Sequence, residues 1–293
     1  MAEKKNILFI INPISGVGKK NRLPLLIEEH LDHSKYNYKI VYTQYRKHGQ
    51  EIAAAEKSNY NVIVAVGGDG SVNEIGSALV GSDCALAIIP CGSGNGLARH
   101  ANIPLKSIDA IARINIFNQT RIDTGKVNEH IFLGTCGFGF DAYIAKKFDE
   151  FNKRGFLSYV RLVLREYRKY QQLNYKITIQ NKSFEKKAFL CSVANSSQFG
   201  NGFTLSPFSD LQDGKFELIF LSKVKLINLP FIVGKFFRKR INQSRHFESV
   251  TFENEIRIEL QESQLTYFHL DGEPMDKTGV FDIKILPASL ILI

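Results

Sequence analysis

The sequence lacks the features of a membrane-spanning or secreted protein. No run approaches the ~20 consecutive apolar residues that a spanning helix needs. Residues 7–11 are apolar and follow two lysines, but this run is too short for a signal peptide and stops at Asn12-Pro13. No Cys-x-x-Cys pair is present, and the cysteines lie in apolar or glycine-rich stretches, at Cys84, Cys91, Cys136 and Cys191. We therefore expect a soluble, cytoplasmic protein with buried, reduced thiols.

Repeats and biased composition are also absent. Hydrophobic residues make up 44% and charged residues 23% of the 293 residues, as in ordinary globular proteins, and nothing repeats at a solenoid period. This length predicts two domains. The formal charge of +9 favours an anionic partner, such as a nucleotide, an acidic lipid or a nucleic acid. No RNP, zinc or basic-zipper pattern accompanies it, so we expect no nucleic-acid binding.

Apolar strands alternate with helices in the first 120 residues. The predicted strands cover residues 5–11, 38–43, 61–66 and 85–90, and the predicted helices cover 22–31, 47–57, 71–80 and 107–117. Strands that are apolar throughout and alternate with helices form a parallel sheet with both faces covered. We expect an N-terminal α/β domain over residues 1–123. The final apolar run, residues 284–293, packs back either on this domain, which it would complete, or on the second domain.

Short strands follow one another closely after residue 121. They are predicted over residues 121–127, 130–136, 174–180, 187–195, 214–221, 249–258, 265–270 and 280–285. This succession is typical of an antiparallel sandwich or barrel. Two helices are predicted to interrupt it, over 142–171 and 225–242. The second domain, a mainly antiparallel β-sandwich, is therefore expected over residues 124–283.

Three glycine-rich loops follow predicted strands of the first domain. They are Asn12-Pro-Ile-Ser-Gly16, Gly67-Gly-Asp-Gly-Ser-Val-Asn73 and Gly92-Ser-Gly-Asn-Gly96. The carboxyl ends of parallel strands form the ligand crevice of an open α/β sheet. Glycine lets the backbone approach a phosphate, and the next helix supplies unpaired N–H groups. The loops predict a phosphate site without a complete Walker A or GxGxxG signature; ordinary tight turns are the alternative.

Asp69 lies between glycines where we expect a phosphate. A bare carboxylate and a phosphate repel each other, so this position favours a Mg²⁺ ion between them or proton transfer from an incoming hydroxyl to Asp69. Aspartate also favours tight corners, which is the structural alternative. Ser71 and Glu74 have the spacing of a capping box, which assigns Glu74 to a helix N-terminus.

Three motifs resemble the diacylglycerol kinase catalytic-domain family, which includes sphingosine kinases, ceramide kinases and bacterial soluble lipid kinases. They are Gly67-Gly-Asp-Gly-Ser-Val-Asn-Glu74, Pro90-Cys-Gly-Ser-Gly-Asn-Gly-Leu-Ala98 and Leu270-Asp-Gly-Glu273. The resemblance implies an N-terminal nucleotide-binding domain like that of NAD kinases and phosphofructokinases, and a C-terminal β-sandwich domain for the lipid. It also implies transfer of the γ-phosphate of ATP to a lipid hydroxyl, with ATP and Mg²⁺ as cofactors.

The resemblance assigns roles to individual residues. Asp69 and Glu273 are the two candidates for the general base. Asp141 resembles the sphingosine-kinase residue that holds a lipid amino group by charge pairing, and a helix N-cap is the alternative. The residues that would contact the nucleotide or its metal are Asn12, Pro13, Ser15, Gly16, Thr43, Gly67, Gly68, Gly70, Ser71, Asn73, Gly92, Ser93 and Asn95.

A later segment, residues 206–216, resembles a family stretch that binds a structural Mg²⁺ in some bacterial members. Asp213 would be the main ligand, with Asp210 and the carbonyl of Lys215 assisting. Gln212 stands where an aspartate is frequent in the family. An ordinary Asp-Gly hairpin turn is the alternative for this segment.

Two segments mix apolar and basic side chains, residues 153–170 and 229–240. They predict peripheral docking on the inner face of an anionic membrane, because each nearby basic residue contributes ~1 kcal/mol and buried apolar surface adds to it. A solvated face on a packed helix is the alternative. The sequence leaves open whether the lipid is diacylglycerol or a sphingoid base, and whether the chain forms a homodimer. Two alternative functions also remain: an NAD-kinase-like or other small-molecule kinase, and a non-catalytic regulator that binds nucleotide and lipid.

Overall fold

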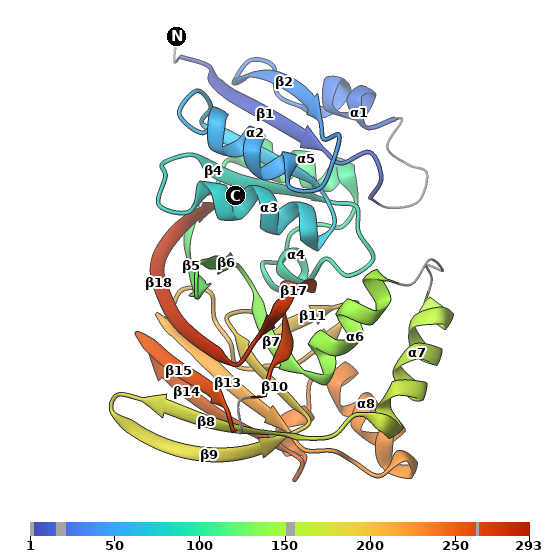
Figure 1. Cartoon of the computed structure of the whole chain (residues 1–293). Coiled ribbons are helices and arrows are strands. Elements are labelled where there is room, and N and C mark those ends of the chain that lie inside the picture. Colours follow the sequence, from blue (N-terminus) through green and yellow to red (C-terminus); the bar gives the residue numbers. More distant parts are fainter. Residues whose placement is uncertain (1–2, 16–21, 151–155, 262–263) are drawn as a thin grey trace. The chain divides into compact units, whose positions relative to one another are not determined.

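The computed structural model describes residues 3–15, 22–150, 156–261 and 264–293 (Figure 1). The chain divides into two compact units. Unit 1 contains Met1–Thr124, Gly200–Gly202 and Pro287–Ile293, and unit 2 contains Gly125–Phe199 and Phe203–Leu286. No helix in the described ranges is long and apolar enough to cross a membrane.

Unit 1 is built on parallel strands in the order β2-β1-β3-β4. The strands are β1 (Lys5–Ile11), β2 (Tyr36–Tyr42), β3 (Val62–Gly67) and β4 (Ala85–Pro90). Every residue of β3 and β4 is buried, as expected for strands that are covered on both faces. The end of β18 (Val280–Leu292) extends this sheet, with Leu292 paired in parallel to Leu86. This pairing accounts for the apolar run at the C-terminus.

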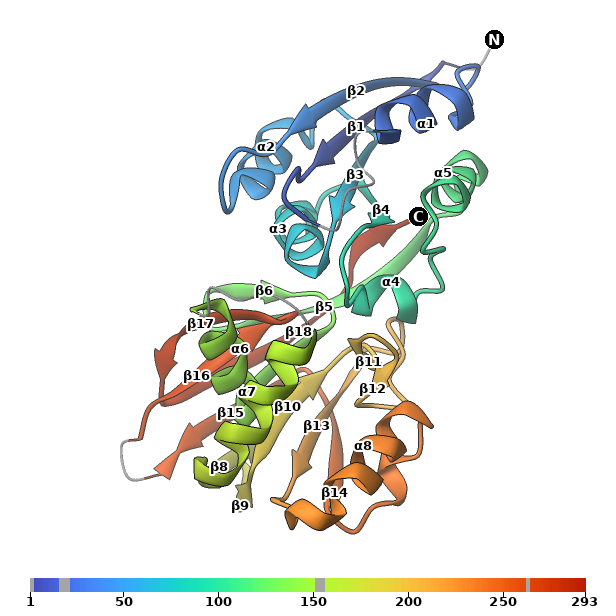
Figure 2. The same cartoon turned by 90° about the vertical axis from the view of Figure 1, so that its right-hand side faces the viewer.

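Helices cover the two faces of this sheet in pairs (Figure 2). The paired helices are α1 (Leu23–His30), α2 (His48–Glu56), α3 (Asp69–Leu79) and α5 (Ser107–Ile116), and the short helix α4 (Gly96–His100) follows the loop after β4. Helix α1 packs with α5 and helix α2 packs with α3. Leu23 and Ile111 bury their side chains in the same core cluster as Phe9 of β1. The predicted alternation of strands and helices is thereby confirmed, with the short helix α4 as an addition.

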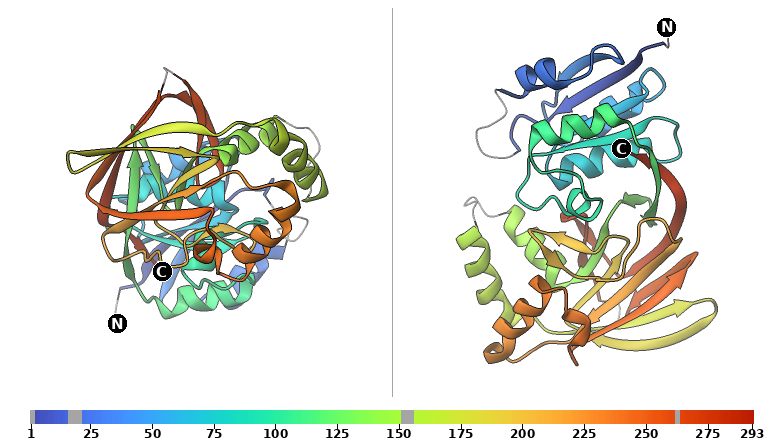
Figure 3. Two further views of the ribbon diagram at one scale, coloured as in Figure 1. Left: turned by 90° about the horizontal axis from the view of Figure 1, so that it is seen from below. Right: turned by 180° about the vertical axis from the view of Figure 1, so that it is seen from behind.

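Unit 2 is an antiparallel sandwich. One sheet has the order β14-β13-β10-β7-β16-β17, and its strands are β7 (Thr135–Gly139), β10 (Leu190–Ala194), β13 (Lys215–Leu221), β14 (Phe247–Glu253), β16 (Thr266–Leu270) and β17 (Glu273–Thr278). The other sheet pairs the first part of the long strand β18 with β15 and continues to β8 and β9 (Figure 3). These strands are β15 (Glu255–Leu260), β8 (Leu173–Ile179) and β9 (Lys182–Ala188), with β5 (Thr120–Val127) and β6 (His130–Phe132) pairing at its side.

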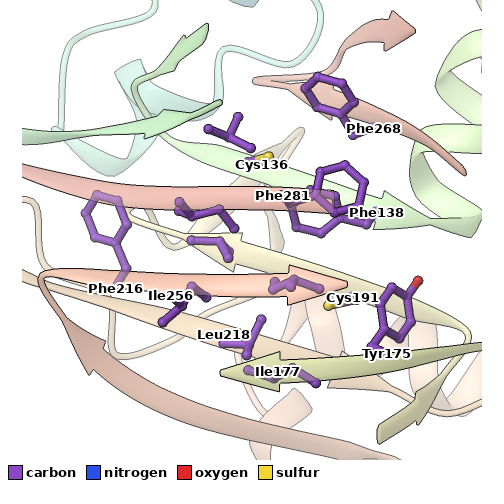
Figure 4. Packing of buried hydrophobic residues seen from close by; sticks show 14 of the residues in the cluster. Cys136, Phe138, Tyr175, Ile177, Cys191, Phe216, Leu218, Ile256, Phe268 and Phe281 are labelled. Atoms are coloured by element: carbon purple, nitrogen blue, oxygen red, sulfur yellow. The ribbon is translucent and has the colours of Figure 1, made fainter. Parts of the chain in front are cut away.

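The core of unit 2 lies between these two sheets (Figure 4). Phe138 of β7 and Phe281 of β18 come from opposite sheets, and their ring centroids are 4.1 Å apart. Phe268 of β16 meets the Phe281 ring edge-on at 5.6 Å. Burying one such side chain contributes about 2–3 kcal/mol, so these contacts hold the two sheets face to face. The predicted fold class is confirmed in both halves of the chain.

Several predicted elements are divided in the structure. The strand predicted over 249–258 is two strands, because Asn254 has a left-handed backbone (φ 64°) and the chain changes sheets there. Asparagine tolerates this conformation better than most residues. The strand predicted over 187–195 is likewise divided, between β9 and β10. Both predictions of one continuous strand were wrong, because apolar patterning does not report a change of sheet.

The two predicted helices of unit 2 are also divided. The prediction over 142–171 corresponds to α6 (Phe140–Asp149) and α7 (Phe156–Lys169), while residues 151–155 lie outside the described part of the chain. The prediction over 225–242 corresponds to η2 (Leu226–Asn228), α8 (Leu229–Phe237) and η3 (Ile241–Gln243). A proline in the first turn of α8 suits the start of a helix, where its missing N–H has no partner to lose. The two remaining short strands are β11 (Gln198–Gly200) and β12 (Phe203–Thr204).

Candidate active site

The predicted phosphate loops lie at the carboxyl ends of neighbouring parallel strands of unit 1. Asn12 follows β1, and its side-chain Nδ2 donates a hydrogen bond to Ser71 Oγ in helix α3 at 3.0 Å. Its Oδ1 accepts the N–H of Ile14 at 3.0 Å, and Ser15 Oγ donates to the Asn12 carbonyl at 3.2 Å. Asn12 therefore joins the loop after β1 to the loop after β3. Pro13 is in this loop, whereas Gly16 lies outside the described residues.

The loops after β3 and β4 touch through their glycines. A Cβ atom placed on Gly92 would lie 2.6 Å from Gly68 Cα, a distance that real Cβ atoms do not adopt. A Cβ atom on Gly67 would collide with the side chain of Ser71. The backbones can approach this closely only because no side chain is present. The glycines of the two motifs are thus required by the contact between the loops.

Asp69 connects these two loops. It begins helix α3, and its Oδ2 accepts the N–H of Asn95 at 2.8 Å while its Oδ1 accepts the N–H of Gly96 at 2.6 Å. A Cβ atom on Gly94 would lie 2.6 Å from Asp69 Oδ2. Charge-assisted hydrogen bonds of this kind are about twice as strong as neutral ones. Asp69 therefore fixes the loop after β4, a role that the sequence did not predict.

Asn95 closes the same loop on itself. Its backbone is left-handed (φ 53°) and its side chain is buried. The side-chain Oδ1 accepts the N–H of Gly92 at 3.0 Å, and Nδ2 donates to the Gly92 carbonyl at 2.8 Å. Ser93, in contrast, is exposed at the tip of the loop. The loop after β4 is therefore shaped by Asp69 and Asn95 together.

The assignment of Glu74 to a capping box was wrong. Helix α3 begins at Asp69, and its N-cap residue Gly68 makes no side-chain cap. The extended backbone of Gly68 lets the helix start two residues before the predicted position. Glu74 Oε1 instead accepts the N–H of Lys47 at 2.8 Å, and Lys47 is the N-cap residue of α2. Glu74 thus stabilises the start of a different helix.

A further segment against the loop after β4 escaped the sequence analysis. Gly200 has a φ of 110°, and a Cβ atom there would lie 2.8 Å from Gly94 Cα. The carbonyl of Gly94 accepts the N–H of Asn201 at 3.0 Å and Arg99 Nε at 3.0 Å. The turn-forming residues 200–202 were the available signal, but the sequence did not indicate which loop they contact.

Thr43, another predicted nucleotide contact, follows β2 and is half-buried. Its N–H donates a hydrogen bond to the carbonyl of Ile11 in β1.

In unit 2, Asp271 holds the turn that precedes Glu273. Its Oδ1 accepts the N–H groups of Gly134 and Thr135 at 2.7 and 2.8 Å, and its Oδ2 accepts the N–H of Leu133 at 2.8 Å. Asp271 and its neighbouring glycine both have positive φ, which is the geometry of a two-residue hairpin turn. Glu273 follows as the first residue of β17 and pairs with Leu270. The three bonds to Asp271 therefore fix the backbone that carries Glu273.

Asp141 is paired with a histidine. Its Oδ2 lies 3.0 Å from His269 Nε2, and both side chains are largely buried. A Cβ atom on Gly137 would collide with both side chains, so this glycine makes room for the pair. Asp141 lies inside the first turn of α6, after the N-cap residue Gly139, so it is not an N-cap. Asp141 Oδ1 is buried and has no hydrogen-bond partner in the part of the chain that the structure describes.

Known protein families match both units. The diacylglycerol kinase catalytic domain matches residues 6–127, and the YegS C-terminal NAD kinase beta sandwich-like domain matches residues 134–293. The chain belongs to the diacylglycerol kinase catalytic-domain family. The resemblance that the motifs predicted is therefore confirmed, and the chain is a kinase.

Relatives of this kinase share most of its length. A Pectobacterium atrosepticum protein named "Probable lipid kinase YegS-like" is 30% identical over 235 residues, which cover 78% of this chain and 76% of that protein. A Pseudomonas putida protein of the same name is 26% identical over 82% of this chain and 79% of its own length. A crystal structure described as a diacylglycerol kinase from Bacillus anthracis str. Sterne has a TM-score of 0.74 at 19% identity, and a second structure from that organism has a TM-score of 0.79 at 22% identity. Each structure matches 100% of this chain and 98% of its own, and this likeness supports the fold.

The segment predicted to bind a structural Mg²⁺ in this kinase has the local bonds of turns. Asp210 Oδ1 accepts the N–H of Gln212 at 3.0 Å, and Asp213 Oδ1 accepts the N–H of Lys215 at 2.9 Å. Gly214 has a positive φ of 69°. Within the described ranges, no three His, Cys, Asp or Glu side chains gather as a metal site requires. The Mg²⁺ site at Asp210, Asp213 and Lys215 stays a prediction.

Proposed function

We propose that this kinase transfers the γ-phosphate of ATP to the hydroxyl group of a membrane lipid, either diacylglycerol or a sphingoid base. The observation that carries the proposal is the carboxylate of Asp69, which holds the amides of Asn95 and Gly96 at the edge of a parallel sheet where glycine loops meet. Such edges bind nucleotides in open α/β folds. The lipid-kinase relatives support the class of acceptor.

Unit 1 would bind the nucleotide and unit 2 the lipid. The N–H groups at the start of α3 and the close-packed glycines offer the triphosphate a backbone surface without side chains. The residues that we assign to nucleotide binding are Asn12, Pro13, Ser15, Gly16, Thr43, Gly67, Gly68, Gly70, Ser71, Asn73, Gly92, Ser93 and Asn95. Among them, Asn12 and Asn95 act by holding loops in place.

The oxygen donors at this edge fit Mg²⁺, which prefers carboxylate and hydroxyl ligands together with phosphate oxygens. We assign Asp69 to hold the ion, because two N–H donors fix its carboxylate next to the expected phosphates. When bound, Mg²⁺ supplies positive charge that offsets the charge on the phosphate groups. We assign the general base to Glu273, because the Asp69 carboxylate is committed to the loop and to the ion.

The proposed reaction needs one proton transfer and one displacement. The Glu273 carboxylate takes the proton of the lipid hydroxyl, and the oxygen attacks the γ-phosphorus. A new P–O bond forms, the bond to the β–γ bridging oxygen breaks, and ADP leaves. Backbone N–H groups of the glycine loops stabilise the negative charge on the transferring group. Asp271 positions Glu273 for this step through the turn that it holds.

Asp141 bears on the choice of lipid. A buried carboxylate with one unpaired oxygen would attract an ammonium group, which a sphingoid base has and diacylglycerol lacks. We therefore expect Asp141→Asn to lower kcat/KM for a sphingoid base and leave phosphorylation of diacylglycerol unchanged. Equal losses on both lipids would remove Asp141 from substrate selection.

The decisive experiment incubates the full chain with labelled ATP and Mg²⁺ and identifies products by mass. The acceptor panel contains diacylglycerol, monoacylglycerol, sphingoid base and ceramide, with NAD and sugars as soluble competitors. Transfer to a lipid supports the proposal, whereas transfer only to a soluble acceptor, or ATP binding without transfer, refutes it.

Two variants separate the roles within the site. Glu273→Gln removes a proton acceptor, so kcat should fall by at least a hundredfold while ATP affinity is kept. Asp69→Asn places an amide against two N–H donors, so both kcat and ATP affinity should fall. A Glu273→Gln enzyme that turns over every lipid at the unmodified rate would exclude Glu273 as the base.

A further inference from the structure

One segment of unit 2, residues 222–246, has acidic or basic side chains of one sign only. This segment contains no Asp or Glu, and its basic residues are Lys223, Lys225, Lys235, Arg238, Lys239, Arg240 and Arg245. Ordinary protein surfaces intersperse charges of both signs. Arg238, Lys239 and Arg240 are exposed, and none of them forms an ion pair with a described residue. A cluster of this kind fits an anionic partner.

The inner side of helix α8 anchors this segment in the protein. Ile232 and Phe236 are buried in a core cluster with Ile219 of β13. The ring of Phe236 also stacks on Phe203, with centroids 4.0 Å apart. Because this face is packed, α8 presents its outer face in a fixed orientation.

The outer side of the same segment exposes large apolar side chains. Ile227 is 79% exposed, Phe231 is 73% exposed and Phe237 is 54% exposed. Ile227 and Phe231 are four residues apart, a spacing that brings side chains together on a helical surface. Exposed apolar side chains beside cations are characteristic of helices that lie in a membrane interface.

Helix α7 adds basic side chains next to η2. A hollow of about 440 Å³ is lined by Leu164, Arg165, Arg168, Lys169 and Leu226. The hollow therefore combines three cations with two leucines, as the head and first chain atoms of an anionic phospholipid require.

The chain before η2 is bonded directly to α7. The Tyr167 hydroxyl donates to the Val224 carbonyl at 2.8 Å and accepts the Val224 N–H at 2.9 Å. Helix α8 begins directly after η2, and Leu226 of η2 lines the hollow together with residues of α7. The basic and apolar groups of α7, η2 and α8 thus form one preformed surface.

We propose that this surface docks the kinase on an anionic phospholipid bilayer. Ile227 and Phe231 enter the interface between headgroups and chains, and Arg238, Lys239 and Arg240 pair with lipid phosphates. We call the surface of α7, η2 and α8, together with these five residues, the docking surface. The inference rests on the proposed function, since a lipid acceptor lies in a bilayer, and charge complementarity selects an anionic one.

The first test measures co-sedimentation of the full chain with phosphatidylglycerol-containing and pure phosphatidylcholine vesicles. We expect binding only to the anionic vesicles, and weaker binding as salt is added. Arg238→Gln/Lys239→Gln should reduce binding about twenty-five-fold, from a factor of about five for each basic residue. The matched control is Lys182→Gln/Lys187→Gln, which removes two exposed cations from β9 and should bind like the unmodified chain.

The second test removes the apolar pair with Ile227→Ser/Phe231→Ser. We expect at least a tenfold loss of vesicle binding, and a matched fall in phosphorylation of lipid held in vesicles. Phosphorylation of a short-chain, water-dispersed lipid should be unchanged, which also shows that the variant is folded. The control Ile116→Ser changes a residue that is 75% exposed on α5 and should have no effect.

The outcomes distinguish this inference from the proposed function. If both double variants bind vesicles normally while lipid is still phosphorylated, the docking surface is wrong and the function stands. If the variants lose vesicle binding but no lipid is ever phosphorylated, the docking surface stands and the function fails. If the apolar double variant instead converts a dimer to a monomer in sedimentation velocity, the surface binds a second copy of the chain and the inference is overturned.

Discussion

Replacing Asp271 with alanine should destabilise unit 2 strongly. The carboxylate accepts three N–H groups, from Leu133, Gly134 and Thr135, and these donors belong to buried residues. A hydrogen bond to a charged group contributes about 1.5–3 kcal/mol. We use the lower value because Asp271 is half-buried and water can reach part of the space that alanine leaves. Three bonds then give a loss of about 4.5 kcal/mol, a large share of a typical domain stability of roughly 5–15 kcal/mol.

Urea denaturation followed by far-UV circular dichroism measures this loss. The midpoint should fall while the slope m is kept, because the surface exposed on unfolding does not change. Asp271→Asn retains one carbonyl oxygen for Gly134 and Thr135 but turns an NH₂ group toward the N–H of Leu133, so it should lose less than the alanine variant.

Asp276→Ala is the matched control for this measurement, since Asp276 is exposed on the same hairpin. Its effect should stay within about 0.5 kcal/mol. If Asp271→Ala unfolds at the unmodified urea concentration, the three hydrogen bonds do not hold the turn and the argument for Glu273 positioning fails with them.

Three further predictions concern the glycine loops, the alkylation of Cys91 and the stability of the folded chain at high pH. Gly92→Ala would place a Cβ atom 2.6 Å from Gly68 Cα, so the loops must separate and calorimetry should find ATP affinity reduced at least tenfold. Cys91 follows β4 directly and is only partly buried, so ATP with Mg²⁺ should slow its alkylation. Without nucleotide it should react before Cys84, whose pKa burial raises to about 11. Burial also raises the pKa of Tyr170 to about 12. Both groups therefore stay protonated in the folded chain at a pH where the unfolded chain ionises, and the melting temperature should fall between about pH 9 and 12. The first prediction fails if Gly92→Ala binds ATP with unchanged affinity, and the second fails if ATP does not protect Cys91. The third fails if the melting temperature stays constant over this pH range.

Local patterning was sufficient to predict the elements of both units. Strands β3 and β4 are apolar at every position, and this alone predicts a sheet covered on both faces. The boundaries that failed depend on single residues. Gly68 allows α3 to begin at Asp69, and Asn254 turns the chain from one sheet to the other. Neither effect has a hydrophobic period, so pattern analysis could not find it.

The loops of the candidate site were also predictable, because glycine marks them in the sequence. Their partners were not. Asp69 bonds residues 26 and 27 positions away, and Asp271 bonds residues 136 to 138 positions away. The contact between Asp141 and His269 spans 128 positions. Such contacts are set by the pairing of whole strands, and a motif within one strand contains no information about them.

Asp69 in unit 1 and Asp271 in unit 2 have the same structural role, which is to hold a loop in place through backbone hydrogen bonds. Each is an acidic side chain in a glycine-containing motif, and each accepts two or more backbone N–H groups from a loop distant in sequence. A loss of activity on mutating either residue therefore does not identify it as a base, because the loop or turn moves as well. Glu273 differs in that its neighbour Asp271 already holds the backbone. Its conservative substitution to glutamine can thus remove a proton acceptor while the turn stays in place, and this makes Glu273→Gln the sharper test of the chemistry.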